Sequence, residues 1–253
     1  MNGVRRVGVL GGMGPAATAD FYRRLIAATG AATDQEHLPV AIWADPRTPD
    51  RTAALLDGGP DPRPWLASGT RWLVDAGCEV LAMPCNTAHA FLATVRAEAG
   101  DAYVVDMVEQ TAAAVAARHP GARAAVMATP GTVRSGLYTR ALGRRGLEPV
   151  VPDEGRQRLI TAAIRAGKAG ADPREAAAVL TPVLESLVAA GADVVVTACT
   201  ELPLLHHHSG DWPLPVVDST EVLATTTVEL AQAGPPDRGE TPCPRTTVPA
   251  PNR

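Results

Sequence analysis

The sequence predicts an α/β fold made of two similar units, each with an open parallel sheet covered by helices. Two observations predict this fold: short apolar runs alternate with amphipathic stretches of helical period, and one half of the chain partly repeats the other. The chain has 253 residues, of which 46% are hydrophobic. This length suits one large α/β domain or two small ones, each with a core of its own.

Seven short apolar runs have the composition of buried strands. They are Val7–Leu10, Val40–Ala44, Val80–Met83, Tyr103–Val105, Ala124–Ala128, Val194–Thr197 and Val216–Val217. Between them, six stretches carry apolar residues at helical spacing, namely Ala16–Thr29, Trp65–Ala76, Thr87–Ala97, Val108–Arg118, Arg156–Ala166 and Glu175–Ala190. Because strands and helices alternate, the strands are expected to be parallel neighbours joined by crossover helices.

The internal repeat is clearest around two cysteines. Ala76–Thr87 matches Ala190–Glu201, and each segment runs from a helix end through a glycine and a strand to a cysteine. Upstream, Val7–Gly14 lies over Ala124–Gly131 at a similar offset. These matches indicate that the chain is a duplicated α/β unit.

The repeat divides the chain into two units and a tail. We assign residues 1–105 and 216–233 to the first unit and residues 106–215 to the second. Two units related by a pseudo-two-fold axis would meet at the carboxyl ends of their strands, where open α/β sheets bind ligands. Residues 234–253, which include Cys243, are proline-rich and aperiodic, and this composition predicts a disordered tail.

Cys85 and Cys199 each follow a buried strand and precede a helix, at equivalent positions of the repeat. The free N–H groups and the dipole of a helix N-terminus stabilise a thiolate, so the pKa of both thiols is expected to lie below the usual value of about 8.5. Buried cysteines are also common small hydrophobic residues, but the duplicated setting favours chemistry. Cys78 matches Ala192 in the repeat, and we assign it to the core.

Three segments at the predicted cleft suit a carboxylate ligand. Gly11–Pro15 follows the first strand and opens a helix, so its N–H groups can bind an anion. Arg51 follows the second strand, where it is either a bidentate carboxylate clamp or an exposed surface arginine. Thr129 lies in the repeat counterpart of the glycine loop and offers a hydroxyl to a second carboxylate.

The glycine loop also fits a dinucleotide-binding pattern. Gly12–Ala17 reads G-x-G-x-x-A, a fingerprint that requires an acidic residue about 20 positions further on. The nearest candidate, Asp45, is roughly 30 positions on and is followed by proline. This spacing disfavours nucleotide binding.

Composition and cysteine spacing exclude several other classes of protein. The net charge of −4 and a pI near 5.9 give no basic surface for nucleic acid or for an anionic membrane, so a small-molecule partner is expected. No apolar run approaches the roughly 20 residues needed to span a bilayer, and no leader-like segment opens the chain, so we expect a cytoplasmic protein with reduced thiols. Zinc-type Cys/His spacing is absent from the sequence, which predicts no metal.

Histidine and lysine give weaker signals. The run His206–His208 is interpreted as a solvated helix end, because adjacent histidines diverge. His89, one turn past Cys85, either tunes that thiol or packs in the core. Lys168 is the single lysine beside 22 arginines.

Several motifs, in this order, resemble the aspartate/glutamate racemase family, and most closely its aspartate racemase branch. The resemblance covers residues 4–233, and the motifs are Gly11–Pro15, Asp34–His37, Pro49–Ala53, Met83–His89, Gly131–Thr132 with Ser135–Tyr138, and Cys199–Glu201.

The resemblance implies two flavodoxin-like domains, usually in a homodimer, that racemise amino acids with neither pyridoxal phosphate nor a metal. It makes Cys85 and Cys199 the catalytic residues. The candidate substrate-binding residues are Met13, Gly14, Arg51, Asn86, Thr87, Thr129, Arg165, Thr200 and Glu201. Two positions depart from the family: Ala198 replaces a glycine, and Arg165 stands where similar aspartate racemases have a substrate-binding lysine.

Racemisation without an electron-sink cofactor requires a base on one face of the α-carbon and an acid on the other, and two thiols supply both. Aspartate is the expected substrate, with glutamate or another amino acid as the alternative. A decarboxylase or a cis-trans isomerase of a dicarboxylic acid is a further alternative on this scaffold, although neither requires two acid/base thiols. A non-catalytic amino-acid-binding protein is the third possibility, since such a protein requires no reactive thiol.

Overall fold

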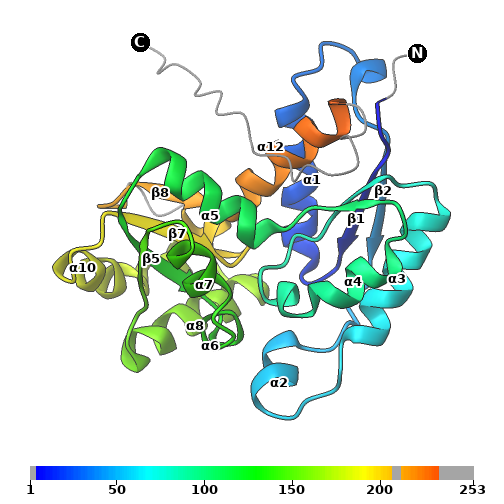
Figure 1. Ribbon diagram of the computed structural model, residues 1–253. Helices are drawn as coiled ribbons and strands as arrows, with labels where there is room; N and C mark the ends of the chain where they lie inside the picture. The colour runs from blue at the N-terminus through cyan, green and yellow to red at the C-terminus, as the bar shows by residue number, and fades with distance from the viewer. Residues whose placement is uncertain (1–3, 207–211, 234–253) are drawn as a thin grey trace.

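The computed structural model describes residues 4–206 and 212–233, and these form two α/β domains side by side (Figure 1). Each domain contains a four-stranded parallel sheet with helices packed on both faces. The predicted fold class is therefore confirmed. The predicted tail with Cys243, and His207 and His208, lie outside the described residues.

The first sheet has the strand order β2-β1-β3-β4. Its strands are β1 (Val7–Gly11), β2 (Val40–Ala44), β3 (Val80–Ala82) and β4 (Tyr103–Val104). One face packs on α1 (Pro15–Thr29) and α12 (Ser219–Gln232), and the other on α3 (Arg63–Asp75) and α4 (Leu92–Glu98). The connections of this domain also contain the 3-10 helices η1 (Asp34–Glu36) and η2 (Thr87–Phe91) and the short helix α2 (Arg51–Leu56).

The second sheet repeats that order as β6-β5-β7-β8. Its strands are β5 (Arg123–Ala128), β6 (Glu148–Val150), β7 (Val194–Ala198) and β8 (Val216–Asp218). One face packs on α5 (Met107–Arg118) and α7 (Leu137–Gly143), and the other on α8 (Glu154–Lys168), α9 (Pro173–Ala178) and α10 (Thr181–Ala189). Two short helices, α6 (Pro130–Arg134) and α11 (Leu202–His206), follow β5 and β7.

The duplication extends to individual hydrogen bonds. Arg6, just before β1, donates from its guanidinium to the carbonyl of Ala76 at 2.5 Å. Arg123, at the start of β5, makes the same bond to Ala190 at 2.5 Å. Ala76 and Ala190 match in the sequence repeat, and each ends a helix. In both domains, an arginine at or just before the start of the first strand therefore satisfies the free carbonyl at the equivalent helix end.

Three predicted boundaries are corrected by the structure. Val216–Asp218 forms β8 and pairs with β7, so these residues belong to the second sheet and the chain returns to the first domain only at α12. The predicted helix over Thr87–Ala97 is the 3-10 helix η2 followed by α4. The predicted helix over Glu175–Ala190 is divided into α9 and α10, because Pro182 lacks the N–H that a continuous helix needs.

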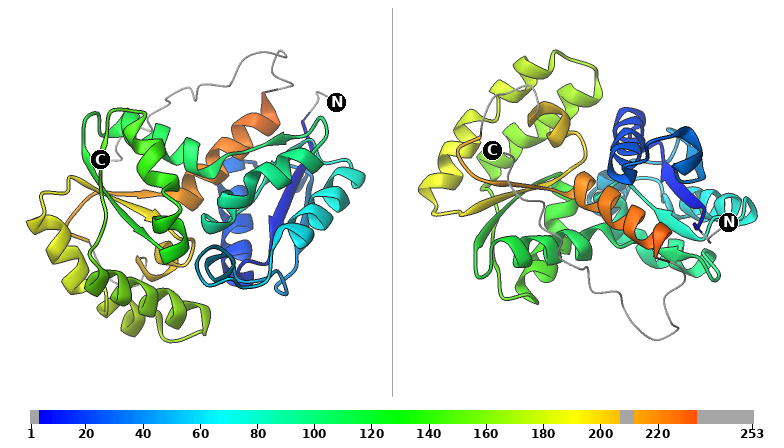
Figure 2. Two further views of the ribbon diagram at one scale, coloured as in Figure 1. Left: turned by 60° about the horizontal axis from the view of Figure 1, so that its bottom comes forward. Right: turned by 90° about the horizontal axis from the view of Figure 1, so that it is seen from above.

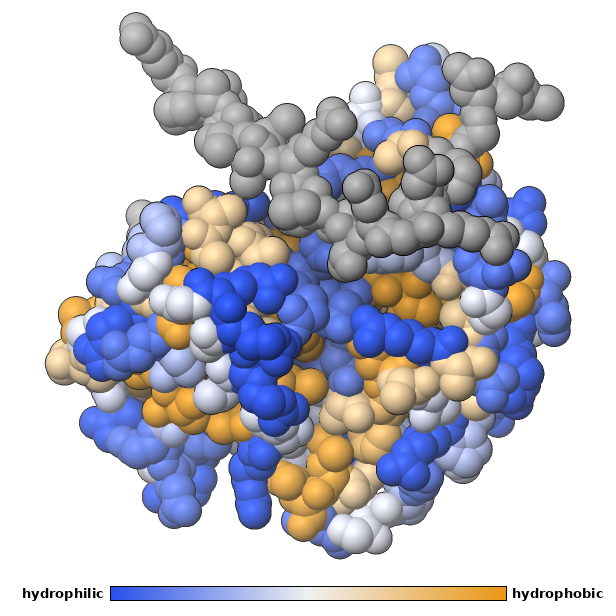
Figure 3. Space-filling model, in the orientation of Figure 1, coloured by the Kyte–Doolittle hydropathy of each residue, from blue (hydrophilic) through white to orange (hydrophobic). Residues whose placement is uncertain are grey.

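Helix α12 joins the two halves of the molecule. It packs along α1 and also contacts α5 of the second domain, as the two views of Figure 2 show. Hydrophilic and hydrophobic residues are interspersed over the face drawn in Figure 3. Within the described ranges, no helix combines the length and the apolar character required to cross a membrane.

Candidate active site

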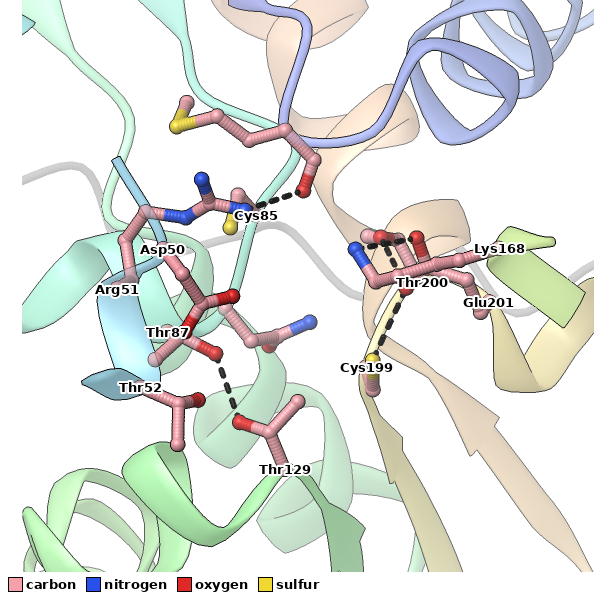
Figure 4. A pocket seen from close by; sticks show the side chains of 12 residues that line it. Asp50, Arg51, Thr52, Cys85, Thr87, Thr129, Lys168, Cys199, Thr200 and Glu201 are labelled. Atoms are coloured by element: carbon pink, nitrogen blue, oxygen red, sulfur yellow. Dashed lines mark hydrogen bonds and ion pairs between the residues drawn. The ribbon is translucent and has the colours of Figure 1, made fainter. Parts of the chain in front are cut away.

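The two repeat cysteines line one cavity between the domains, at the carboxyl ends of β3 and β7 (Figure 4). The cavity is small, about 40 Å³. Its lining comes from both domains and consists of Met13, Asp50, Arg51, Thr52, Cys85, Asn86, Thr87, Thr129, Lys168, Cys199, Thr200 and Glu201. The duplicated positions thus converge as the repeat predicts.

The turn at Cys85 is held by backbone and histidine hydrogen bonds. The Cys85 side chain is buried, and its backbone N–H donates to the carbonyl of Met83 at 2.7 Å. The Nε2 atom of His89 accepts from the N–H of Met107 at 3.1 Å, so its Nδ1 carries the proton and donates to the Cys85 carbonyl at 2.9 Å. Burial lowers the pKa of His89, which keeps the ring neutral. His89 therefore positions the Cys85 turn against the start of α5.

Asn86 is tied to both domains. The Tyr138 hydroxyl, from α7, donates to Asn86 Oδ1 at 2.5 Å, and Asn86 Nδ2 donates to Ser219 Oγ at 3.1 Å. Ser219 in turn donates to the carbonyl of Thr197 at 2.7 Å. Burial raises the pKa of Tyr138, so it remains a phenol at neutral pH. This network fixes the orientation of the first-domain turn relative to the second sheet.

Three threonine hydroxyls form a closed ring across the domain boundary. Thr87 Oγ1 lies 2.8 Å from Thr129 Oγ1 and 2.9 Å from Thr132 Oγ1, and the last two oxygens are 3.1 Å apart. Each hydroxyl has a single proton, so a closed ring of three uses all of its donors. Thr129 Oγ1 also accepts from the backbone N–H of Thr132 at 3.3 Å, so Thr87 Oγ1 is the cavity oxygen that keeps acceptor capacity, which suits an ammonium group better than a carboxylate.

Cys199 has a different neighbourhood. Its Sγ donates to Glu201 Oε2 at 3.0 Å, and Thr200 Oγ1 lies 3.4 Å from the same oxygen. Lys168 Nζ pairs with Glu201 Oε1 at 3.0 Å. Burial, together with the negative charge of Glu201, raises the pKa of Cys199 well above its ordinary value. The expected lowering of this pKa is wrong, because a carboxylate contacts the sulfur while α11 begins only at Leu202.

Arg51 is buried at the first-domain side of the cavity, with 9% of its surface exposed. Its Nη1 donates to the carbonyls of Thr48 at 2.9 Å and Pro49 at 3.0 Å, and its Nη2 donates to that of Met13 at 3.2 Å. Its Nε has no partner among the described residues. Arg51 is thus a cation held in place by three backbone carbonyls, and its Nε–H is a donor without a partner in the described part of the chain.

Lys168 is the cation that sequence reasoning missed. It lies at the end of α8, lines the cavity and has a side chain that is 37% exposed. Burial opposes its charge, but the negative charges of Glu201, Cys199 and Cys85 together outweigh burial and raise the pKa of Lys168. Arg165, the predicted ligand one turn earlier, is exposed and does not line the cavity, so that assignment is corrected.

Gly14 lies at the border between this cavity and a larger one of about 820 Å³. The two cavities share five lining residues: Met13, Asp50, Arg51, Lys168 and Glu201. A Cβ atom on Gly14 would lie 3.6 Å from Glu201 Oε1, so the glycine loop of the first domain touches the ion pair of the second. Gly14 therefore lines the larger cavity rather than the space around the thiols.

The glycine loop has a local structural role. Gly12 adopts a φ of 88°, and a Cβ there would collide with the backbone of Asp45 at 2.5 Å. The N–H of Gly12 donates to Thr18 Oγ1, and that hydroxyl donates to the carbonyl of Gly14, both at 2.9 Å. The carboxylate of Asp45 binds Arg47, at 2.9 Å for each of two bonds. Asp45 therefore does not present a free carboxylate to a ribose.

Groups of three or more metal-ligating side chains are absent from the described part of the chain. His206, from the histidine run, packs edge-on against Trp212 with a centroid distance of 4.7 Å.

Comparisons with known proteins agree with this architecture. The sequence profile of one protein family, Asp/Glu/Hydantoin racemase, matches residues 10–227. A broad specificity amino-acid racemase of Bacillus subtilis is 28% identical over 88% of this chain and 96% of its own length. A glutamate racemase of Deinococcus radiodurans is 37% identical, over 57% of this chain and 49% of its own. Among solved structures, an aspartate racemase of Picrophilus torridus has a TM-score of 0.79 and 30% identity, covering 90% of this chain and 94% of that one.

Proposed function

Since the chain belongs to the Asp/Glu/Hydantoin racemase family, we propose that this amino-acid racemase interconverts L- and D-aspartate by proton transfer between the α-carbon and the thiols of Cys85 and Cys199. The observation that carries the proposal is the placement of these two thiols, one from each domain, in a single cavity. Neither pyridoxal phosphate nor a metal takes part in the proposed reaction.

The two thiols act on opposite faces of the substrate. One sulfur, as thiolate, takes the α-proton, and the other, as thiol, delivers its own proton to the opposite face. The Cα–H bond of one enantiomer breaks and the Cα–H bond of the other forms, so the reaction is balanced in protons. The roles exchange in the reverse direction.

The charges around the cavity suit an amino acid with two carboxylates. Arg51 supplies a cation from the first domain and Lys168 one from the second, and both line the space next to the thiols. In our proposal these cations bind the two carboxylates and stabilise the negative charge that develops as the α-proton leaves. The oxygen of Thr87 accepts a hydrogen bond from the α-ammonium group.

Aspartate is favoured over glutamate by one comparison. The aspartate racemase of Picrophilus torridus matches almost the whole chain. The predicted homodimer and the cytoplasmic location stay predictions.

Incubation in D₂O tests the proposal. Purified protein is mixed with single enantiomers of aspartate and glutamate, and α-deuterium is followed by proton NMR while chirality is followed by chromatography. We expect deuterium at the α-carbon and both enantiomers from either form of aspartate, with slower exchange of glutamate.

Proton NMR also tests the alternative functions, with maleate and fumarate added in separate samples. Loss of a carboxyl group would identify a decarboxylase, and interconversion of maleate and fumarate a cis-trans isomerase. Binding of aspartate without α-exchange would show a non-catalytic binding protein. Any of these results in place of racemisation would refute the proposal.

A further inference from the structure

The second half of the cavity contains a continuous chain of three ionisable side chains. Cys199 Sγ donates to one oxygen of Glu201 at 3.0 Å, and Lys168 Nζ pairs with the other at 3.0 Å. Glu201 is 4% exposed, so this carboxylate is buried and has a partner on each oxygen. Both of its oxygens already interact with the protein's own donors, which favours a positioning role over the predicted role of Glu201 as a substrate ligand.

We propose that Glu201 is a positioning residue that holds Cys199 in its thiol form, so that Cys199 is the proton donor and Cys85 the proton acceptor in the resting enzyme. The assignment of donor and acceptor rests on the racemase function proposed above. The hydrogen-bonded geometry of Cys199, Glu201 and Lys168 does not.

The charges that face Cys199 support this role. A thiol bonded to a carboxylate is a donor, whereas a Cys199 thiolate would place a second negative charge 3.0 Å from the buried carboxylate of Glu201. Lys168, from α8, offsets part of that repulsion. Burial further disfavours the Cys199 thiolate. Across the cavity, Arg51 is already bonded to three backbone carbonyls, and Asp50 caps α2 by accepting from the N–H of Ala53 at 2.7 Å.

The turn at Cys85 has no equivalent carboxylate. The two residues that follow Cys85 are Asn86 and Thr87, both neutral, where the second domain has Thr200 and Glu201. Within the described residues, no carboxylate hydrogen bonds to Cys85. The two thiols therefore stand in chemically different surroundings although the fold places them equivalently.

This asymmetry orders the proton transfers. In the resting enzyme, the Cα–H bond of one enantiomer breaks toward Cys85 as the S–H bond of Cys199 breaks and its proton moves to the opposite face of the carbon. Release of product leaves a Cys85 thiol and a Cys199 thiolate beside Glu201. Proton exchange with water then restores the favoured form, in which Cys199 again carries the proton.

Site-resolved alkylation tests the inference without any substrate. The full-length protein is treated with iodoacetamide for short times over pH 6 to 10, and modification of each cysteine is quantified by peptide mass spectrometry. The variants are Glu201→Gln, Glu201→Asp and Lys168→Met. Circular dichroism and thermal unfolding establish that each variant is folded, and Cys85 serves as the internal reference in every digest.

The Glu201→Gln and Lys168→Met substitutions should shift the pH midpoint of Cys199 alkylation in opposite directions. Glu201→Gln removes the negative charge, so the pH midpoint for Cys199 alkylation falls by one unit or more, which is about a tenfold faster reaction at a fixed pH below the midpoint. Lys168→Met removes the compensating cation, so that midpoint rises. Glu201→Asp keeps the carboxylate and stays close to the parent protein, which a merely structural role would not require.

Two results would overturn the inference: an unchanged Cys199 profile in folded Glu201→Gln, or alkylation of Cys199 ahead of Cys85 as the pH of the parent protein is raised. Because no amino acid is present, these outcomes are independent of the D₂O experiment. A failure of racemisation and a failure of the Glu201 assignment can therefore be told apart.

Discussion

The turns after β3 and β7 are the same piece of backbone used twice with different side chains. In each sheet, the strand that comes third along the chain ends at one of these turns, and each turn carries a buried cysteine. Both cysteines line the cavity between the domains. The hydrogen-bonding side chains of the first turn itself, Asn86 and His89, are neutral. The second is surrounded by the charged pair of Glu201 and Lys168.

The difference separates two tasks that the fold performs. Duplication of the scaffold brings two sulfur atoms to one cavity, and this depends on strands, glycines and buried apolar residues that both halves share. In our proposal, the protonation of each sulfur depends on the side chains around it, which for Cys199 are Glu201 and Lys168. Equivalent position therefore does not imply equivalent chemistry.

The largest expected effect comes from removing either thiol. Cys85→Ala and Cys199→Ala should each lower kcat for aspartate racemisation by about 10³-fold, because each deletes the acid or base on one face of the carbon. Polarimetry or chiral chromatography measures the loss. Cys78→Ala is the matched control, since Cys78 is a buried thiol that does not line the cavity, and it should retain activity within about twofold below its unfolding temperature. Full activity in either single variant of the cavity cysteines would contradict the two-thiol mechanism.

A smaller loss is expected when a cation is removed from the second half. Lys168→Met should lower kcat/KM by about 100-fold, mainly through KM, because a charged hydrogen bond to a carboxylate contributes roughly 1.5–3 kcal/mol. Arg165→Met is the matched control on the same helix and should stay within about twofold. Steady-state kinetics with both enantiomers measures these changes. If Arg165→Met were the damaging substitution, the placement of Lys168 at the substrate would be wrong.

The smallest expected effect is a pH dependence of stability specific to the first half, where His89 has Pro203 as its repeat counterpart. Burial lowers the pKa of His89 below its ordinary 6.5. The unfolded chain therefore binds a proton more readily than the folded one, and the contribution of His89 to stability is present above pH 6.5 and lost as the pH falls below it.

Urea unfolding of the parent protein and of His89→Gln at pH 5.5 and 7.5 measures this effect. The stability advantage of the parent should shrink at the lower pH, by up to about 1.4 kcal/mol per pH unit below the unfolded-state pKa. Parallel pH dependences in the two proteins would show that His89 does not titrate differently on folding.

The architecture could be predicted from the sequence because several independent patterns indicate the same fold. Strand periodicity, the repeat around Cys85 and Cys199, and the glycines at the helix ends all indicate two parallel sheets. The boundary at β8 was misplaced because three residues, Val216–Asp218, carry too little pattern to show which sheet they join. The pairing of β8 with β7 is a tertiary contact that the local sequence does not encode.

The site was less predictable because it depends on side-chain directions. Arg165 and Lys168 are three residues apart on α8 and share a helix face, so periodicity does not choose between them. The single lysine of an arginine-rich chain was the available signal. The thiol of Cys199 was misjudged for a similar reason: Glu201 is two residues away in the sequence, but only the folded turn shows its carboxylate on the sulfur.

The return of the chain at α12 has a consequence for how the protein is made. Leu223 and Val228 of α12 pack in the same core as Val7 and Val9 of β1, and the N–H of Arg5 donates to the carbonyl of Ala231 at 2.9 Å. During synthesis, one face of the first sheet is therefore covered by α1 but not yet by α12 while the whole second domain emerges from the ribosome. The domain that is translated first is the last to be completed, and the cavity with its two thiols can form only after almost the entire chain has been released.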